Sequence, residues 1–268
     1  MALENKCDVH THTNFSRHAY STIEENVRAA SAMGLELLGN ADHFSLMLYG
    51  ENPQIRDYQF FLNQSVWPRT WMGVTLLRAM EADIVDIDGH LFGMDTIAHE
   101  HITGGKFDNP CSMYEHLVKH LDYVVASVHN NQFTANTTVA QNTQMYIDVI
   151  QQPKVFILGH PGRSGVEFDH KAVFEAARDN HVAIEINECT FKRNEGIHVC
   201  TRMAEECAQW GVPIAISTDA HISPTIGHFR NTLSMLESIH FPEELIITKN
   251  RSSFLHALDN AGLSIETE

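Results

Sequence analysis

Two histidines separated by one residue, His10 and His12, are the first feature of the sequence that could do chemistry. They lie in a segment, Lys6 to His12, that we predict to be a β-strand. Side chains two positions apart project to the same side of a strand, so Asp8, His10 and His12 are expected to face one way. Neutral imidazoles are good ligands for zinc and similar divalent ions. The pair predicts a metal site, although an isolated H-x-H motif often occurs by chance.

Seven short apolar segments, alternating with helical segments, would position further ligands. The predicted strands are residues 6–12, 35–41, 73–84, 121–129, 154–161, 182–187 and 212–218. The predicted helices are residues 22–34, 137–150, 169–180, 196–210, 226–239 and 252–261. This alternation is typical of parallel strands covered by helices. We therefore predict an α/β fold, a distorted seven-stranded (β/α)7 TIM-like barrel, with residues 1–268 forming a single domain.

Side chains that bind metals fall at the ends of these predicted strands, where barrels of this kind build their active sites. With His18, which follows the first strand, there are nine candidate ligands: His10, His12, His18, His43, Glu81, His129, His160, Asp219 and His221. One ion needs about three or four protein ligands, so nine candidates predict two or three ions. Glu81 is the natural bridge between ions, because a carboxylate has two oxygens. Ions held close together can bind a hydroxide nucleophile between them and clamp a phosphoryl group.

A series of ordered motifs runs along nearly the whole chain. The motifs are 8–13 (DVHTHT), 18–21 (HAYS), 41–43 (ADH), 81–84 (EADI), His129, 160–162 (HPG), 185–187 (EIN) and 217–221 (STDAH). In this order they resemble the PHP (polymerase and histidinol phosphatase) family, and within it the YcdX-type phosphatases. The resemblance implies a distorted seven-stranded barrel that hydrolyses phosphate esters at a trinuclear metal site.

The resemblance also implies how the ligands divide and act. One ion would be bound by His10, His12, Glu81 and Asp219, a second by Glu81, His129 and His160, and a third by His18, His43 and His221. The three divalent ions would be zinc, with manganese or iron as alternatives. A hydroxide that bridges the ions would attack a small phosphomonoester, with Glu81, Asp219 and His221 as the catalytic residues.

Other side chains are expected to support this site. Arg163 and Arg193 follow the fifth and sixth predicted strands and could bind the phosphate, as could Asn187 at the end of the sixth. Asp8 and Asp42 are expected to accept hydrogen bonds from metal-bound imidazoles and so fix their tautomers. Residues at about 86–120 are predicted to be an insertion over or beside the mouth of the site.

Composition restricts the partners of the protein. The net charge is −16, from 18 Lys and Arg against 34 Asp and Glu, which argues against long nucleic acids and anionic membranes as partners. A small phosphorylated substrate held by local cations remains compatible with this charge. The five cysteines contain no C-x-x-C pair, and the sequence shows no signal peptide or membrane-spanning run, so we expect a cytoplasmic protein. A homo-oligomer is left open.

Three alternative functions remain. A phosphodiesterase or exonuclease acting on short nucleotides would use the same ligands. An amidohydrolase-like enzyme would normally carry a Lys or a carboxylate at the end of the fourth strand, where this chain has Ser127-Val128-His129. A non-catalytic metal-binding module would be expected to lack some ligands, whereas all nine positions are filled here.

Overall fold

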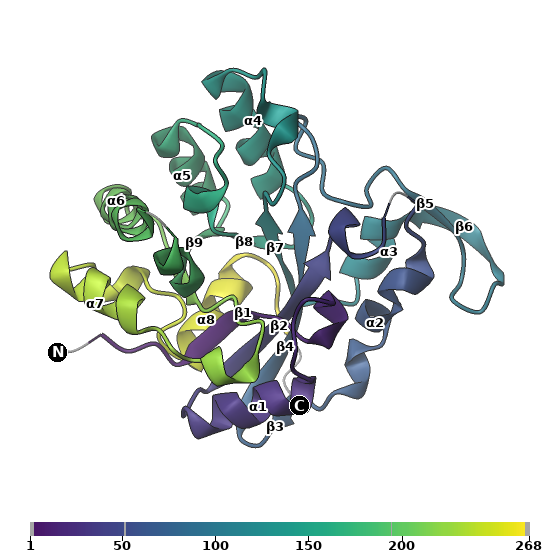
Figure 1. Ribbon diagram of the computed structural model, residues 1–268, viewed down its shortest axis with the longest axis horizontal. Helices are drawn as coiled ribbons and strands as arrows, with labels where there is room; N and C mark the ends of the chain where they lie inside the picture. The colour runs from purple at the N-terminus through teal and green to yellow at the C-terminus, as the bar shows by residue number, and fades with distance from the viewer. Residues whose placement is uncertain (1–2, 51, 194, 266–268) are drawn as a thin grey trace.

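Seven parallel strands form a nearly closed barrel with helices around its outside (Figure 1). This is a computed structural model, and it describes residues 3–50, 52–193 and 195–265. In sheet order the strands are β1 (Cys7–Thr11), β2 (Leu37–Phe44), β4 (Val74–Asp83), β7 (Tyr123–Ser127), β8 (Val155–Leu158), β9 (Ala183–Asn187) and β10 (Ile214–Ser217). The predicted α/β barrel with seven strands is confirmed.

Helices connect successive strands or follow β10, and some of them begin at side-chain caps. The longer ones are α1 (Ile23–Ala32), α4 (Val139–Ile150), α5 (His170–Asp179), α6 (Gly196–Trp210), α7 (Arg230–Ser238) and α8 (Arg251–Asn260). Thr22 forms a capping box with Glu25 at the start of α1, and Thr138 forms one with Gln141 at the start of α4. Among the described residues, no helix is both long and apolar enough to cross a membrane.

The barrel closes where β1 meets the segment that follows β10. The backbone N–H of Asp219 donates to the carbonyl of His10 at 2.9 Å, and that of His12 donates to the carbonyl of Ala220 at 2.9 Å. These two bonds place the residues after β10 directly beside the end of β1. Candidate ligands that are more than 200 positions apart in the chain therefore become neighbours.

The interior of the barrel changes from apolar to polar along the strands. At the amino-terminal end, Leu37, Leu77 and Tyr123 pack with Phe254 of α8 in one buried cluster. Continuing by twos along β4, the buried Leu77 and Ala79 are followed by the equally buried carboxylate of Glu81. Strand alternation thus places the candidate metal ligands at the carboxyl end of the barrel, above this apolar cluster, which we call the apolar plug.

Residues 86–120 lie between β4 and β7, and their buried side chains, such as Leu91 and Met113, pack into the main hydrophobic core. The segment contains the two-stranded antiparallel sheet of β5 (Ile97–Glu100) and β6 (Lys106–Ser112), followed by the short helix α3 (Met113–Val118). Figure 1 shows this hairpin extending away from the barrel, near α2 (Gln59–Leu62). A last short strand, β3 (Thr70–Trp71), pairs antiparallel with β4.

Candidate metal centre

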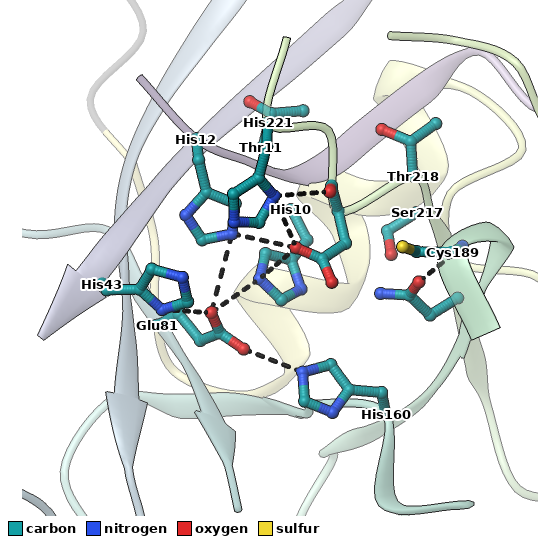
Figure 2. A network of polar contacts seen from close by, with 12 residues as sticks. His10, Thr11, His12, His43, Glu81, His160, Cys189, Ser217, Thr218 and His221 are labelled. Carbon is teal, nitrogen blue, oxygen red and sulfur yellow. Dashed lines mark hydrogen bonds and ion pairs between the residues drawn. The ribbon is translucent and has the colours of Figure 1, made fainter. Parts of the chain in front are cut away.

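The carboxylate of Glu81 lies at the centre of the site and has 0% solvent exposure (Figure 2). Five imidazole nitrogens surround it: His43 Nδ1 at 2.8 Å, His160 Nε2 at 2.9 Å, His10 Nε2 at 3.3 Å, His129 Nε2 at 3.3 Å and His12 Nε2 at 3.6 Å. These rings come from β1, β2 and the segments that follow β1, β7 and β8. The side chains predicted from the strand ends are therefore brought together around one buried carboxylate.

Several buried polar atoms in this cluster have no hydrogen-bond partner among the described residues. They are Glu81 Oε2, His10 Nε2 and both ring nitrogens of His43, whose 2.8 Å contact with Glu81 is an ion-pair distance without hydrogen-bond geometry. Buried polar atoms without partners destabilise a fold unless another group satisfies them. Carboxylate oxygens and imidazole nitrogens are donors that zinc and similar divalent ions take. The donor set therefore fits bound cations.

The centre contains three overlapping groups of three side chains, and in each group the possible ligand atoms lie within 4.8 Å of one another. The groups are His10 with His12 and Glu81, His43 with Glu81 and His129, and His12 with His43 and His221. The first group contains three of the four side chains expected to bind one ion, and it lacks Asp219. The second group has His43 beside Glu81 and His129, where the family resemblance implied His160. His160 nevertheless contacts the same carboxylate through Oε1.

The outer edge of the centre is made by His18 and His221. Their Nε2 atoms lie 2.9 Å apart, and the His18 ring stacks on His43 with the ring centroids 4.9 Å apart. Asp219 lies beneath them, with Oδ1 3.1 Å from His12 Nε2. Its backbone is left-handed (φ 54°), a conformation that is uncommon outside glycine and often marks functional sites.

Two carboxylates orient the inner imidazoles, and neither was predicted in this role. Glu185 accepts from Nδ1 of His10 at 2.7 Å, and Asp83 accepts from Nδ1 of His129 at 2.7 Å. Such bonds fix the tautomer of a metal-binding histidine. The signal was present in the alternation: Asp83 stands two residues after Glu81, and Glu185 is the acidic residue in an apolar strand.

The expectation that Asp8 and Asp42 would fix imidazole tautomers directly is wrong. Asp8 accepts from the backbone and hydroxyl of Thr218 and from the backbone of Gly227. The pairing of β1 with β2 shifts by one residue between Asp8 and Thr11, which breaks the simple alternation assumed for this strand.

Asp42 acts on the histidines only through a serine. It accepts from the hydroxyl of Ser16 at 2.6 Å, and that same Ser16 Oγ lies 3.0 Å from Nδ1 of His12. Asp42 also accepts from Thr13 and Asn40, so all its partners lie near the ends of β1 and β2. It therefore anchors the turn that carries His12.

The protonation of the cluster is uneven. Burial works to lower the pKa of His10, but Glu81, Glu185 and Asp219 outweigh it and raise that pKa well above its usual range. In the same way, Glu81 and Asp83 overcome burial and raise the pKa of His129 to about 10. Burial favours the neutral acid in Glu81, but His10 and His129 hold its pKa well below the usual range. The metal-free centre thus keeps its negative charge on Glu81.

A pocket of about 210 Å³ opens above the centre. Its lining consists of His18, His43, Met47, His129, Arg163, Cys189, Arg193, Asp219 and His221. Two of the three predicted substrate contacts, Arg163 and Arg193, thus lie at the pocket. The third, Asn187, is buried and accepts from the backbone of Cys189. No described residue of the 86–120 segment lines this pocket.

Other histidine and acidic groups lie outside this centre. Asp86, Asp88 and His90 form a further group of donors, in which Asp86 accepts from the backbone of both other residues. The rings of His116 in α3 and of His120, which follows α3, are 6.2 Å apart between centroids. We assign no ion to either group.

The family comparison identifies one matching domain. The model of the PHP domain matches residues 8–188. A probable phosphatase from Clostridium novyi is 35% identical, and the match covers 95% of each chain. A probable phosphatase from Photobacterium profundum is 34% identical over 95% of this chain and 94% of its own length.

Solved structures show the same fold at low sequence identity. The histidinol phosphate phosphatase of Lactococcus lactis, solved with zinc, L-histidinol and phosphate, superposes with a TM-score of 0.57 at 16% identity, covering 89% of this chain and 95% of that one. A putative histidinol phosphatase from Listeria monocytogenes gives 0.56 at 14% identity, covering 85% and 99%.

The protonation pattern predicts that metal binding releases protons. His129 stays charged until the pH approaches about 10, above its usual 6.5, and this charge stabilises the metal-free fold below pH 6.5 and is lost as the pH rises through 10. An ion must displace the protons of His10 and His129, so at pH 7.5 we expect about two protons released per chain loaded. Calorimetric titration with zinc in buffers of different ionisation enthalpy measures this number. Zinc affinity that does not change between pH 6 and 9 would contradict it.

Proposed function

The chain belongs to the PHP domain family, and on that premise we propose that it is a metal-dependent phosphatase that hydrolyses a small phosphomonoester. Relatives that are about 35% identical over 95% of the chain are named probable phosphatases. A histidinol phosphate phosphatase of the same fold holds zinc and phosphate. These names support the reaction class and zinc as the metal.

The observation that carries the proposal is the way Glu81 divides its two oxygens. Oε2 faces His10, His12 and His43, whereas Oε1 faces His129 and His160. A carboxylate with separate imidazoles on each oxygen is arranged to bridge two cations. With His18 and His221 beside His43, the donor set supports a proposal of three ions.

Divalent ions bound at such a site supply an activated water as nucleophile and stabilise the charge that develops on a phosphoryl group. Glu81 and Asp219 would hold the positive charge in place beneath the pocket, while His221 lies at its outer edge. We propose these three as the catalytic residues. The pocket volume of about 210 Å³ and the net charge of −16 favour a small substrate over a polymer.

Arg163 is suited to bind the phosphate and to hold Asp219 at once. Its Nη2 donates to Asp219 Oδ2 at 2.5 Å, while Nη1 is buried and has no hydrogen-bond partner in the part of the chain that the structure describes. Oδ1 of the same carboxylate faces His12, so the arginine fixes which oxygen is turned to the metal ligands. The second nitrogen can donate to a substrate oxygen at the pocket wall. Arg193 lies on the same lining and offers a second cation.

Phosphatase activity should depend on metal. We expect turnover of para-nitrophenyl phosphate by the purified protein, its loss with a chelator, and its return with zinc or manganese. A screen of phosphomonoesters against diesters, including short nucleotides, then ranks the substrates. Turnover that survives complete removal of metal would refute the mechanism, and a preference for diesters would replace the phosphatase by a phosphodiesterase.

The number of ions can be counted through His18. Elemental analysis of the saturated wild-type protein should give near three ions per chain, and His18→Ala should give near two, because this ring serves only the outer group. His256→Ala, an exposed histidine of α8, is the matched control and should keep the wild-type count. A wild-type count of one, or an unchanged count in the His18 variant, argues against the trinuclear arrangement.

Loss of the Arg163 cation should weaken both substrate binding and turnover. Hydrogen bonds to charged groups contribute about 1.5–3 kcal/mol, so Arg163→Gln is expected to reduce kcat/KM by roughly 10- to 100-fold. Arg202→Gln, at an exposed position on α6, is the control and should leave kcat/KM unchanged. The values of kcat/KM are measured by steady-state kinetics with para-nitrophenyl phosphate. An unchanged kcat/KM in Arg163→Gln would show that Arg163 does not bind the substrate.

A further inference from the structure

Strand β9 supplies none of the nine proposed ligands, yet it places one buried carboxylate beneath the site. Glu185 is 2% exposed and contacts residues from three other segments. Its Oε1 accepts from Nδ1 of His10 on β1 and from the hydroxyl of Ser217 on β10. Its Oε2 accepts from the backbone N–H of His160, which follows β8, at 2.7 Å. Glu185 on β9 therefore links the segment after β8, the neighbouring strand β10, and β1 at the other end of the sheet.

The contact with His10 decides which nitrogen of that ring faces the metal position. Because Glu185 accepts from Nδ1, the proton resides there, and Nε2 is the nitrogen available as a ligand. His10 Nε2 lies 3.3 Å from Glu81 Oε2 and has no hydrogen-bond partner within residues 3–50, 52–193 and 195–265. Glu185 thus prepares the ligand on the Oε2 side of Glu81.

The contact with His160 holds an unusual backbone. His160 is left-handed (φ 30°, ψ 49°), and it precedes Pro161, which normally favours extended conformations in the preceding residue. Such a conformation persists only when its surroundings enforce it. The bond from its N–H to Glu185 Oε2 does so, and it leaves His160 Nε2 2.9 Å from Glu81 Oε1. Glu185 thus also prepares the ligand on the Oε1 side.

We propose that Glu185 is a positioning residue that couples the two metal positions bridged by Glu81, so that these positions fill or empty together. This inference rests on the proposed multinuclear site. The two carboxylates are linked through two histidines: each oxygen of Glu185 holds one histidine, and each histidine faces a different oxygen of Glu81. The outer pair, His18 and His221, makes no hydrogen bond to Glu185 among the described residues and should load independently.

Zinc binding to Glu185→Gln tests the coupling. The glutamine side chain has a single acceptor oxygen, so it cannot accept from His10 and from His160 at separate oxygens as Glu185 does. We therefore expect both ions at Glu81 to bind about 10- to 100-fold more weakly and to be lost together. The third ion should remain, and the double variant Glu185→Gln/His18→Ala should lose it. Zinc titration against a competing chelator, with elemental analysis of the dialysed protein, gives both affinity and count.

Glu188→Gln is the matched control. Glu188 is also buried and accepts four hydrogen bonds, from Asn231 and Thr232, but among the described residues it makes no hydrogen bond to a histidine. We expect this variant to lose thermal stability without losing zinc. If Glu185→Gln does not fold by circular dichroism, Glu185→Asp carries the test, because it keeps the charge but is too short to reach both histidines.

The possible results separate the two proposals. A Glu185 variant that loses one ion alone, or none, would overturn the coupling, as would a wild-type chain that binds fewer than two ions. A wild-type chain that binds two or more ions but hydrolyses no phosphomonoester would overturn the proposed function and leave the coupling in place. Paired loss in Glu185→Gln with a normal count in Glu188→Gln supports it.

Discussion

The burial of the Glu81 carboxylate is the constraint on which the rest of this structure depends. An ionised carboxylate removed from water is strongly destabilising unless positive charge or hydrogen-bond donors compensate it. Here Glu81 has 0% exposure, and the imidazoles around it come from four different strands or the loops after them. The barrel has to bring these strands to one point, because the carboxylate has no route to solvent.

The barrel strands bring these groups together because their inward side chains change along the strand, from packing residues at one end to polar residues at the other. Near the amino-terminal end the inward side chains are apolar, such as Leu77 and Tyr123, and they pack against Phe254 of α8. Toward the carboxyl end the same faces carry Glu81 and Glu185. The apolar plug stabilises the fold, and it allows the polar end to keep unpartnered donors and left-handed residues such as His160 and Asp219.

The orientation of the imidazole rings is fixed by carboxylates that accept hydrogen bonds from the ring nitrogens, directly or through a serine. Glu185 and Asp83 each fix one ring, while Asp42 reaches His12 through Ser16. These acidic side chains compensate charge at the same time, because Glu185 helps raise the pKa of His10 and Asp83 that of His129. The acidic composition of the chain is therefore partly a requirement of its own histidine cluster.

The sequence by itself determined the barrel and the nine residues that gather at its carboxyl end, because the period of two along strands and the position of strand ends are local properties. It did not determine the roles of Asp8 and Glu185. A one-residue shift in the pairing of β1 turns Asp8 toward Thr218, and Glu185 reaches His10 only because the barrel nearly closes. Pairing register and closure are contacts between distant segments, and only the tertiary structure decides them.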